Sequence, residues 1–67
     1  MVCYVNNLAH EATENQPLAD LLAALGQAQA RGLAVAVNDT VVPRADWATH
    51  AVQPHDRILL IRATQGG

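Results

Sequence analysis

A single long stretch of this sequence has the apolar spacing of an amphipathic helix, and this limits the folds open to the chain. After Pro17, leucines recur at positions 18, 21, 22 and 25, which lie on one face of a helix. Proline is favourable in the first turn of such a helix, and Gly26 is a typical stop because it tolerates a left-handed backbone. With one helix to cover it, the sheet formed by the rest of the chain must be small and must keep one face without a helix.

The segments on both sides of this helix are apolar and rich in β-branched residues, and they predict short strands. Asn6-Asn7 and Asn38-Asp39 are turn signals between strands, because Asn and Asp tolerate positive φ. A short helical turn over residues 44–50 is expected to place Trp47 as a plug in the core. The expected strands are residues 2–5, 8–13, 33–37, 40–42 and 57–63.

This order of elements predicts an α+β layer with one main helix, a short helix and a mixed sheet of four or five strands. The first and last strands can pair in parallel at the centre, because the helix between them provides the crossover. That is the ubiquitin-like, or β-grasp, arrangement. In the last strand, either Ile58 and Leu60 or Leu59 and Ile61 must face the side without a helix. An apolar patch there would indicate a protein partner, although loops and Trp47 could equally cover it.

Composition and spacing disfavour several classes of function. Four arginines and no lysine stand against six Asp plus Glu, so neither nucleic acid nor an anionic membrane is expected as a partner. The three histidines lack zinc-site spacing, and Cys3 is expected to be a buried, inert thiol, so we expect no metal and no cofactor. There is no Ser/His/Asp set and no glycine-rich phosphate loop, and we expect that the chain is not an enzyme.

Targeting signals are also lacking in the sequence. No signal peptide is evident, and no apolar run approaches the roughly 20 residues that cross a bilayer. A reducing, cytoplasmic setting is therefore expected.

The sequence ends in Thr64-Gln65-Gly66-Gly67, which we expect to be a flexible tail that follows a β-grasp domain of residues 1–63. Two residues without Cβ atoms allow a backbone to enter a channel too narrow for side chains, and they leave the terminal carboxylate unhindered. Taken alone, the Gly-Gly pair is explained better by a frayed terminus.

Several segments together resemble the thiamine-biosynthesis sulfur carrier family, ThiS. They are the Asn38 turn, Val-Pro-Arg at residues 42–44, Trp47, the Asp56-x-Ile58 start of the last strand and the terminal Gly66-Gly67. The resemblance covers nearly the whole chain. The start of the helix also matches, except that Pro17 stands where a threonine cap is common in the family.

The resemblance implies a β-grasp carrier whose Gly67 is adenylated by an ATP-dependent, E1-like activating enzyme and converted to a thiocarboxylate. A sulfur-donor enzyme would supply the sulfur, and thiazole synthase would receive it. ATP and metal would belong to the activating partner. The residues expected to thread into a partner are Thr64, Gln65 and Gly66, and those expected to dock are Leu59, Ile61 and Arg44, the last of which could equally be structural.

Two other functions stay open. The small subunit of molybdopterin synthase has the same fold and tail chemistry but serves another cofactor; Val-Pro-Arg with Trp47, and Gln65 before the glycines, favour the thiamine carrier. A β-grasp interaction module with an inert tail would belong to a different class.

Overall fold

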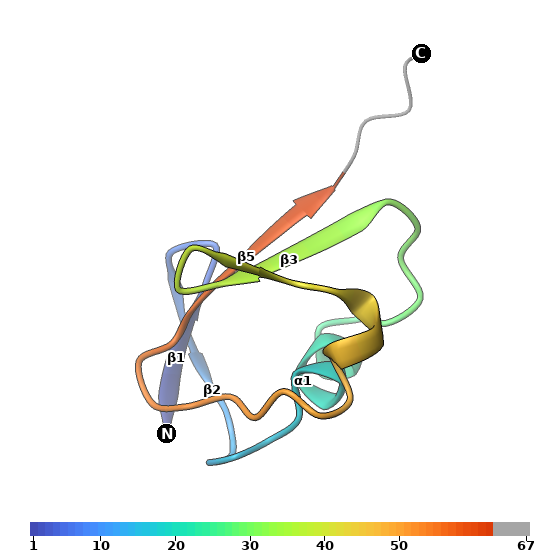
Figure 1. Cartoon of the computed structure of the whole chain (residues 1–67). Coiled ribbons are helices and arrows are strands. Elements are labelled where there is room, and N and C mark those ends of the chain that lie inside the picture. The colour runs from blue at the N-terminus through green and yellow to red at the C-terminus, as the bar shows by residue number, and fades with distance from the viewer. Residues whose placement is uncertain (63–67) are drawn as a thin grey trace.

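The computed structural model describes residues 1–62, and residues 63–67 lie outside the described part. Within residues 1–62 the chain forms a five-stranded sheet with one α-helix against it (Figure 1). The elements are β1 (Val2–Val5), β2 (Leu8–Glu11), α1 (Leu18–Ala24), β3 (Leu33–Val37), β4 (Thr40–Val42), the 3-10 helix η1 (Arg44–Asp46) and β5 (Arg57–Arg62).

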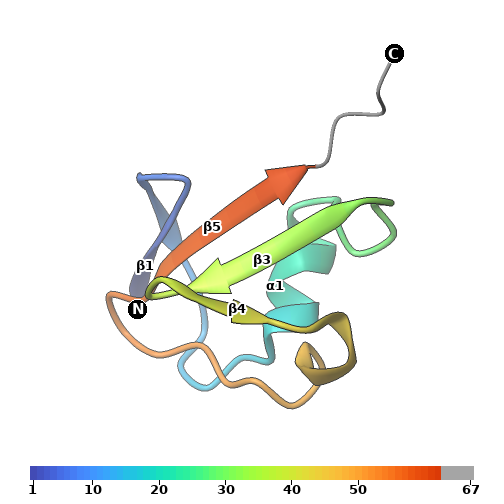
Figure 2. The ribbon, with the colours of Figure 1, turned by 45° about the horizontal axis from the view of Figure 1, so that its top comes forward.

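The strand order is β2-β1-β5-β3-β4, so β5 is the central strand. β1 and β5 run parallel, with Tyr4 opposite Arg57, while the other neighbouring strands are antiparallel. Figure 2 shows β1, β5, β3 and β4 side by side with α1 behind them. The predicted mixed sheet, with its parallel central pair and single main helix, is confirmed as a β-grasp.

Both predicted turns have the expected backbone. Asn6 and Asn7 have φ values of 50° and 69°, and Asn38 and Asp39 have values of 51° and 71°. Two consecutive residues with positive φ make a type I′ turn, whose twist matches that of the strands it joins. β2 ends at Glu11, short of the predicted end at residue 13.

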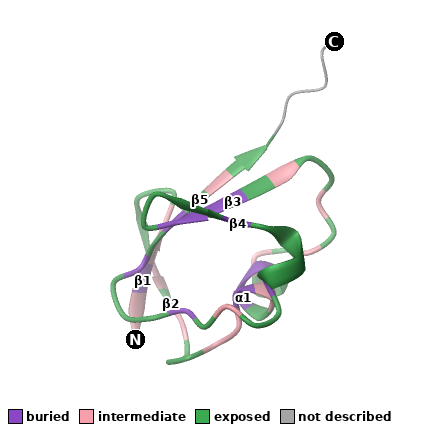
Figure 3. Cartoon of the chain, in the orientation of Figure 1, coloured by how far each residue is buried: buried purple, intermediate pink, exposed green. Residues whose placement is uncertain are grey.

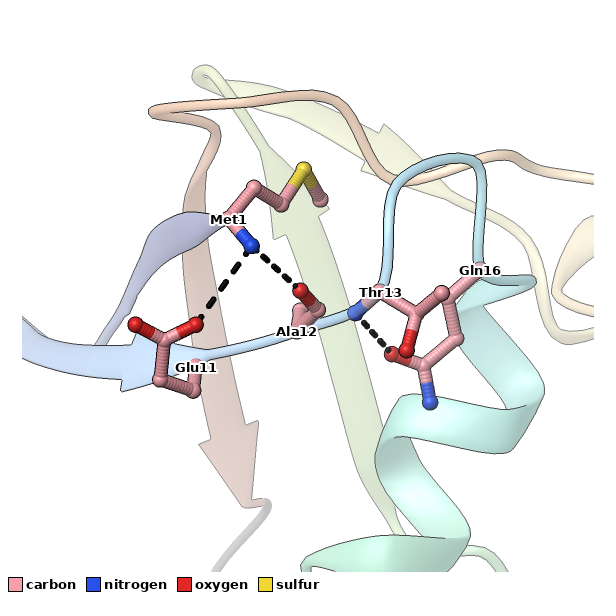
Figure 4. Close-up of polar contacts among 5 residues, drawn as sticks. All are labelled: Met1, Glu11, Ala12, Thr13 and Gln16. Carbon is pink, nitrogen blue, oxygen red and sulfur yellow. Dashed lines mark hydrogen bonds and ion pairs between the residues drawn. The ribbon is translucent and has the colours of Figure 1, made fainter.

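Polar contacts hold the start of β1 against the end of β2 (Figure 4). The Met1 amino group donates to the carbonyl oxygen of Ala12 at 2.8 Å and lies 3.4 Å from the Glu11 carboxylate. Just beyond, the Thr13 N–H donates to Oε1 of Gln16 at 3.2 Å. These bonds fix the path that the chain takes from the hairpin to the helix.

The boundaries of α1 differ slightly from the prediction at its start. Pro17 is the N-cap, with an extended ψ of 141°, and therefore precedes the first turn in which it was expected. The reason is tertiary, because Pro17 also forms a β-bridge with Ala51. At the other end Leu25 is the C-cap and Gly26, with φ of 74°, takes the predicted left-handed position.

The core lies between α1 and the inner face of the sheet, where the buried segments of the ribbon meet (Figure 3). The helix contributes Leu18, Leu21 and Leu22, all at most 1% exposed. Trp47 is 4% exposed, and its Nε1 donates to the carbonyl oxygen of Val42 at 2.9 Å. The bond satisfies the one polar group of the indole, so Trp47 can serve as the predicted plug.

Asp56 is the buried charged residue of the described chain. Its Oδ1 accepts from Nδ2 of Asn38 and its Oδ2 from the backbone N–H of Gln53, both at 2.9 Å. The Asn38 Oδ1 accepts in turn from the N–H of Arg57 at 2.9 Å. The network joins the β3–β4 turn to the start of β5. It also provides hydrogen bonds to the Asp56 carboxylate, whose burial without partners would be unfavourable.

We expect Asp56→Asn to lower the free energy of unfolding by about 2 kcal/mol, because one of the two groups that donate to the buried side chain then faces an NH2 group. Asp39→Asn is the matched control. Its carboxylate lies 3.4 Å from Arg57 in an exposed ion pair, so its loss should change stability little. Urea denaturation followed by circular dichroism measures both, and equal losses would contradict a structural role for Asp56.

Candidate functional site

The predicted site residues fall into two groups, the chain end and the open face of the sheet. The tail, residues 64–67, lies outside the described part of the chain, so its role stays a prediction. The strand that leads to it is the central β5, which ends at Arg62 opposite Leu33 of β3. The Arg62 guanidinium also donates to Oε1 of Gln27, in the loop after α1. The last described residue is thus bound to two other parts of the fold.

Alternation along β5 separates its apolar residues onto opposite faces of the sheet. Ile58 is 2% exposed and Leu60 packs against the core, whereas Leu59 and Ile61 are each 47% exposed. The structure therefore decides between the two sets that the sequence left open. Leu59 and Ile61 lie on the face that has no helix.

Neighbouring strands extend this apolar surface. Val41, which is 64% exposed, pairs with Ala36, and Ala36 pairs with Leu59 on its other side. A surface pocket of about 440 Å³ lies here, and its lining includes Ala36, Val41, Leu59 and Ile61, which we call the open-face patch. The other lining residues are Asn6, Asn7, Asp39, Arg57 and Ile58. Trp47 is buried in the core and does not cover the patch. An exposed apolar patch of this kind is typical of protein-binding surfaces.

Only part of the open-face patch, Leu59 and Ile61, could be predicted from the sequence. Val41 follows Thr40 and precedes the buried Val42, so alternation within β4 turns it outward. Sequence alone does not assign Val41 to the patch, because residues 33–37 of the neighbouring strand are apolar throughout and do not show which face of the hairpin is outward. At the border of the pocket, Arg57 and Asp39 form the exposed ion pair described above.

Arg44 makes contacts within the molecule. Its guanidinium donates to the carbonyl oxygens of Ala30 at 2.7 Å and Ala28 at 3.3 Å, and its Cζ lies 4.5 Å from the centroid of the Trp47 ring. These contacts hold the loop between α1 and β3 against η1. Arg44 does not line the pocket of the open-face patch, and a docking role for it stays a prediction.

Candidate reactive side chains in the described chain are few. Cys3 is fully buried, and burial, with a further contribution from the Asp56 charge, raises the pKa of its thiol. A thiol of raised pKa is a poor nucleophile at neutral pH, as predicted for Cys3. Among residues 1–62 no three His, Cys, Asp or Glu side chains gather closely enough to hold a metal ion. In the same range, no helix has the length and apolar character needed to cross a membrane.

Comparison with known proteins identifies the family to which the chain belongs. The sequence model of the ThiS family matches residues 3–67. The chain belongs to the ThiS family. It is 44% identical over 62 residues to the sulfur carrier protein ThiS of Escherichia coli strain K12, and the match covers 92% of each chain. The resemblance inferred from Val-Pro-Arg, Trp47 and the terminal glycines is confirmed.

Solved ThiS structures share the fold. The crystal structure of the thiamine biosynthesis protein ThiS from Geobacter metallireducens superposes with a TM-score of 0.86 at 28% identity and covers 100% of both chains. An NMR solution structure of a thiamine biosynthesis protein from the same organism gives 0.76 at 28% identity, covering 100% of this chain and 88% of that one. ThiS proteins are small sulfur carriers that work with partner enzymes in thiamine biosynthesis.

We expect Leu59→Asp and Leu60→Asp, adjacent in one strand, to differ clearly in stability. A carboxylate at Leu60 enters the core and should cost about 2–4 kcal/mol, whereas at the exposed Leu59 the cost should stay below about 1 kcal/mol. Thermal unfolding followed by circular dichroism measures the difference. Equal destabilisation of the two variants would show that the assignment of faces is wrong.

Proposed function

We propose that this chain is a sulfur carrier of thiamine biosynthesis and that the Gly67 carboxylate is the group that carries the sulfur. The observation that best supports the proposal is the match to the ThiS family, which extends over residues 3–67 and so includes the terminal glycines. The 44% identity to the Escherichia coli sulfur carrier supports the same role.

The proposed chemistry begins with activation, because a carboxylate has no good leaving group. On an E1-like adenylating enzyme, a Gly67 carboxylate oxygen bonds to the α-phosphorus of ATP and pyrophosphate leaves. Hydrosulfide supplied by a sulfur-donor enzyme then bonds through its sulfur to the acyl carbon and AMP leaves, which gives a thiocarboxylate after loss of the proton. Thiazole synthase receives the sulfur. ATP and any metal ion are held by the partner, and we propose the cytoplasm, where ATP is available, as the setting.

In this mechanism the chain delivers a reactive group and leaves catalysis to its partners. Gly66 and Gly67 have no side chains, so the end of the chain can pass through a narrow channel, with Gln65 and Thr64 following. The central strand β5 ends at Arg62, shortly before this segment, so the sheet fixes the position from which the tail starts. Fixing one end of a short segment raises the effective concentration of its other end at a docked active site.

The open-face patch is the proposed docking surface. Leu59 and Ile61 lie on β5 itself, so a partner bound to them is aligned with the strand that leads into the tail. Apolar side chains provide the area that drives association, and the Arg57–Asp39 pair at the border can provide orientation. Arg44, already bound to backbone carbonyls, is the weaker candidate for a docking contact.

The chain end can be tested directly by mass spectrometry. After incubation with a cognate adenylating enzyme, ATP and a sulfur source, we expect the intact chain to gain the mass difference between one sulfur and one oxygen, located on the peptide that contains Gly67. Deletion of Gly67 should abolish the change, and omission of ATP is the control. An unmodified wild-type chain would contradict the carrier role and favour the alternative function, a β-grasp interaction module whose tail is inert.

The docking surface can be tested separately. We expect Ile61→Asp to weaken binding to the adenylating enzyme by about tenfold or more, because it places a charge in a buried apolar contact. Leu8→Asp is the matched control, since Leu8 is 72% exposed but lies on β2, at the edge of the sheet opposite β4. Calorimetric titration measures both affinities. Equal weakening by the two changes would exclude the open-face patch as the specific contact.

A further inference from the structure

Among the described residues 1–62, the outgoing half of β5, residues 59–62, has a partner strand on one side only. On the β3 side, pairing continues to the last described residue, with Leu33 opposite Arg62. On the β1 side, the parallel register covers only Tyr4 with Arg57 and Val5 with Ile58. β1 then turns away at Asn6, while β5 runs on towards the tail. The segment from residue 59 to residue 62 therefore lies at an edge of the sheet, although it belongs to the central strand.

The Asn6 side chain replaces the missing strand at this point. The backbone N–H of Asn6 donates to the carbonyl oxygen of Ile58 at 2.9 Å, as the next residue of a parallel strand would. The Leu60 N–H then donates to Oδ1 of Asn6 at 2.8 Å. A side-chain amide thus supplies the carbonyl that the backbone of β1, now in the turn, no longer offers. The hydrogen-bond ladder between β1 and β5 therefore continues by one bond beyond the end of β1.

Position 6 must meet two requirements at once. The I′ turn needs a residue that tolerates φ of 50°, which favours Gly, Asn or Asp. The β5 edge needs a short side chain with an acceptor oxygen, which excludes Gly. The turn alone explains Asn7, but it does not explain the bond from Asn6 to Leu60.

We propose that Asn6 is a positioning residue for the carrier reaction, fixing the outgoing half of β5 and so the direction in which residues 63–67 reach the partner. The inference rests on the proposed function and deepens it. Without the Asn6 oxygen, the Leu60 N–H has no partner on the β1 side, and the strand end is held only by β3 and by the Arg62 contact to Gln27. Local opening of such an edge requires little free energy and leaves the core intact.

Three variants separate this role from general stability. Asn6→Gly keeps the positive φ but removes the acceptor oxygen. Asn6→Asp keeps both, since Asp also tolerates a left-handed backbone, and should restore wild-type behaviour. Asn15→Gly is the matched control: Asn15 also has a positive φ, of 61°, and its Oδ1 accepts from Nε2 of Gln53 at 2.9 Å, in the loop between β2 and α1.

Hydrogen exchange and steady-state kinetics are the readouts. In Asn6→Gly we expect the Leu60 amide to exchange about fivefold faster, the effect of losing one hydrogen bond. With the cognate adenylating enzyme and ATP, kcat for adenylation should fall about fivefold. KM for the carrier should change by less than kcat: Asn6 borders the pocket of the open-face patch, but the apolar side chains of the patch stay in place. Asn15→Gly should alter neither readout.

The outcomes distinguish this inference from the function on which it rests. If the wild-type chain is not adenylated, the carrier function fails and the role of Asn6 fails with it. If the wild-type chain is adenylated but Asn6→Gly has the same kcat as Asn15→Gly, only the role of Asn6 is overturned. A faster exchange of Leu60 with unchanged kcat would make Asn6 purely structural, and a raised KM with unchanged kcat would make it a docking residue. Either result overturns the proposal.

Discussion

Burial of the leucine face of α1 against β3 and β5 is the interaction on which the rest of the structure depends. Leu18, Leu21 and Leu22 cover the inner side of the sheet and are met there by Val35 and Ile58. Each such side chain contributes about 1.5–3 kcal/mol when buried, which is large for a domain of this size. Because only one helix is available in the described chain, every apolar residue on the opposite side of β5 stays exposed. The open-face patch is thus a direct consequence of how the core is made.

Much of this fold could be predicted from local sequence. The leucine period gave the helix, two pairs of turn residues gave the hairpins, and the crossover rule gave the parallel pairing of β1 with β5. Local patterns could not say which set of residues in β5 faces outward, because Ile58 to Ile61 is apolar throughout and only packing distinguishes the two sides. Pro17 was expected in the first turn of the helix but is its N-cap. Local sequence could not show this, because Pro17 pairs with Ala51, which lies far away in the sequence.

Polar side chains were the harder part to predict. Asp56 was recognised as part of a family motif, but its partners Asn38 and Gln53 come from separate turns that meet only in the folded chain. Asn6 was recognised as a turn residue, and its bond to Leu60 spans nearly the whole sequence. Of the candidate site, sequence motifs identified the family and the chain end. The structure placed the expected docking residues Leu59 and Ile61 on the face without a helix and added Val41 to them. It also showed that Arg44 is bound within the molecule.

The burial of Cys3 has a chemical consequence for the proposed activation of the chain end. An acyl adenylate or thiocarboxylate at Gly67 would be open to attack by any accessible thiolate or amine of the same chain. Cys3 is the sole cysteine and is enclosed in the core, and the sequence contains no lysine. The Met1 amino group is hydrogen-bonded to the backbone of Ala12. The chain therefore offers neither an accessible cysteine thiol nor a lysine amine to the proposed activated end, which favours transfer of the acyl group to external nucleophiles.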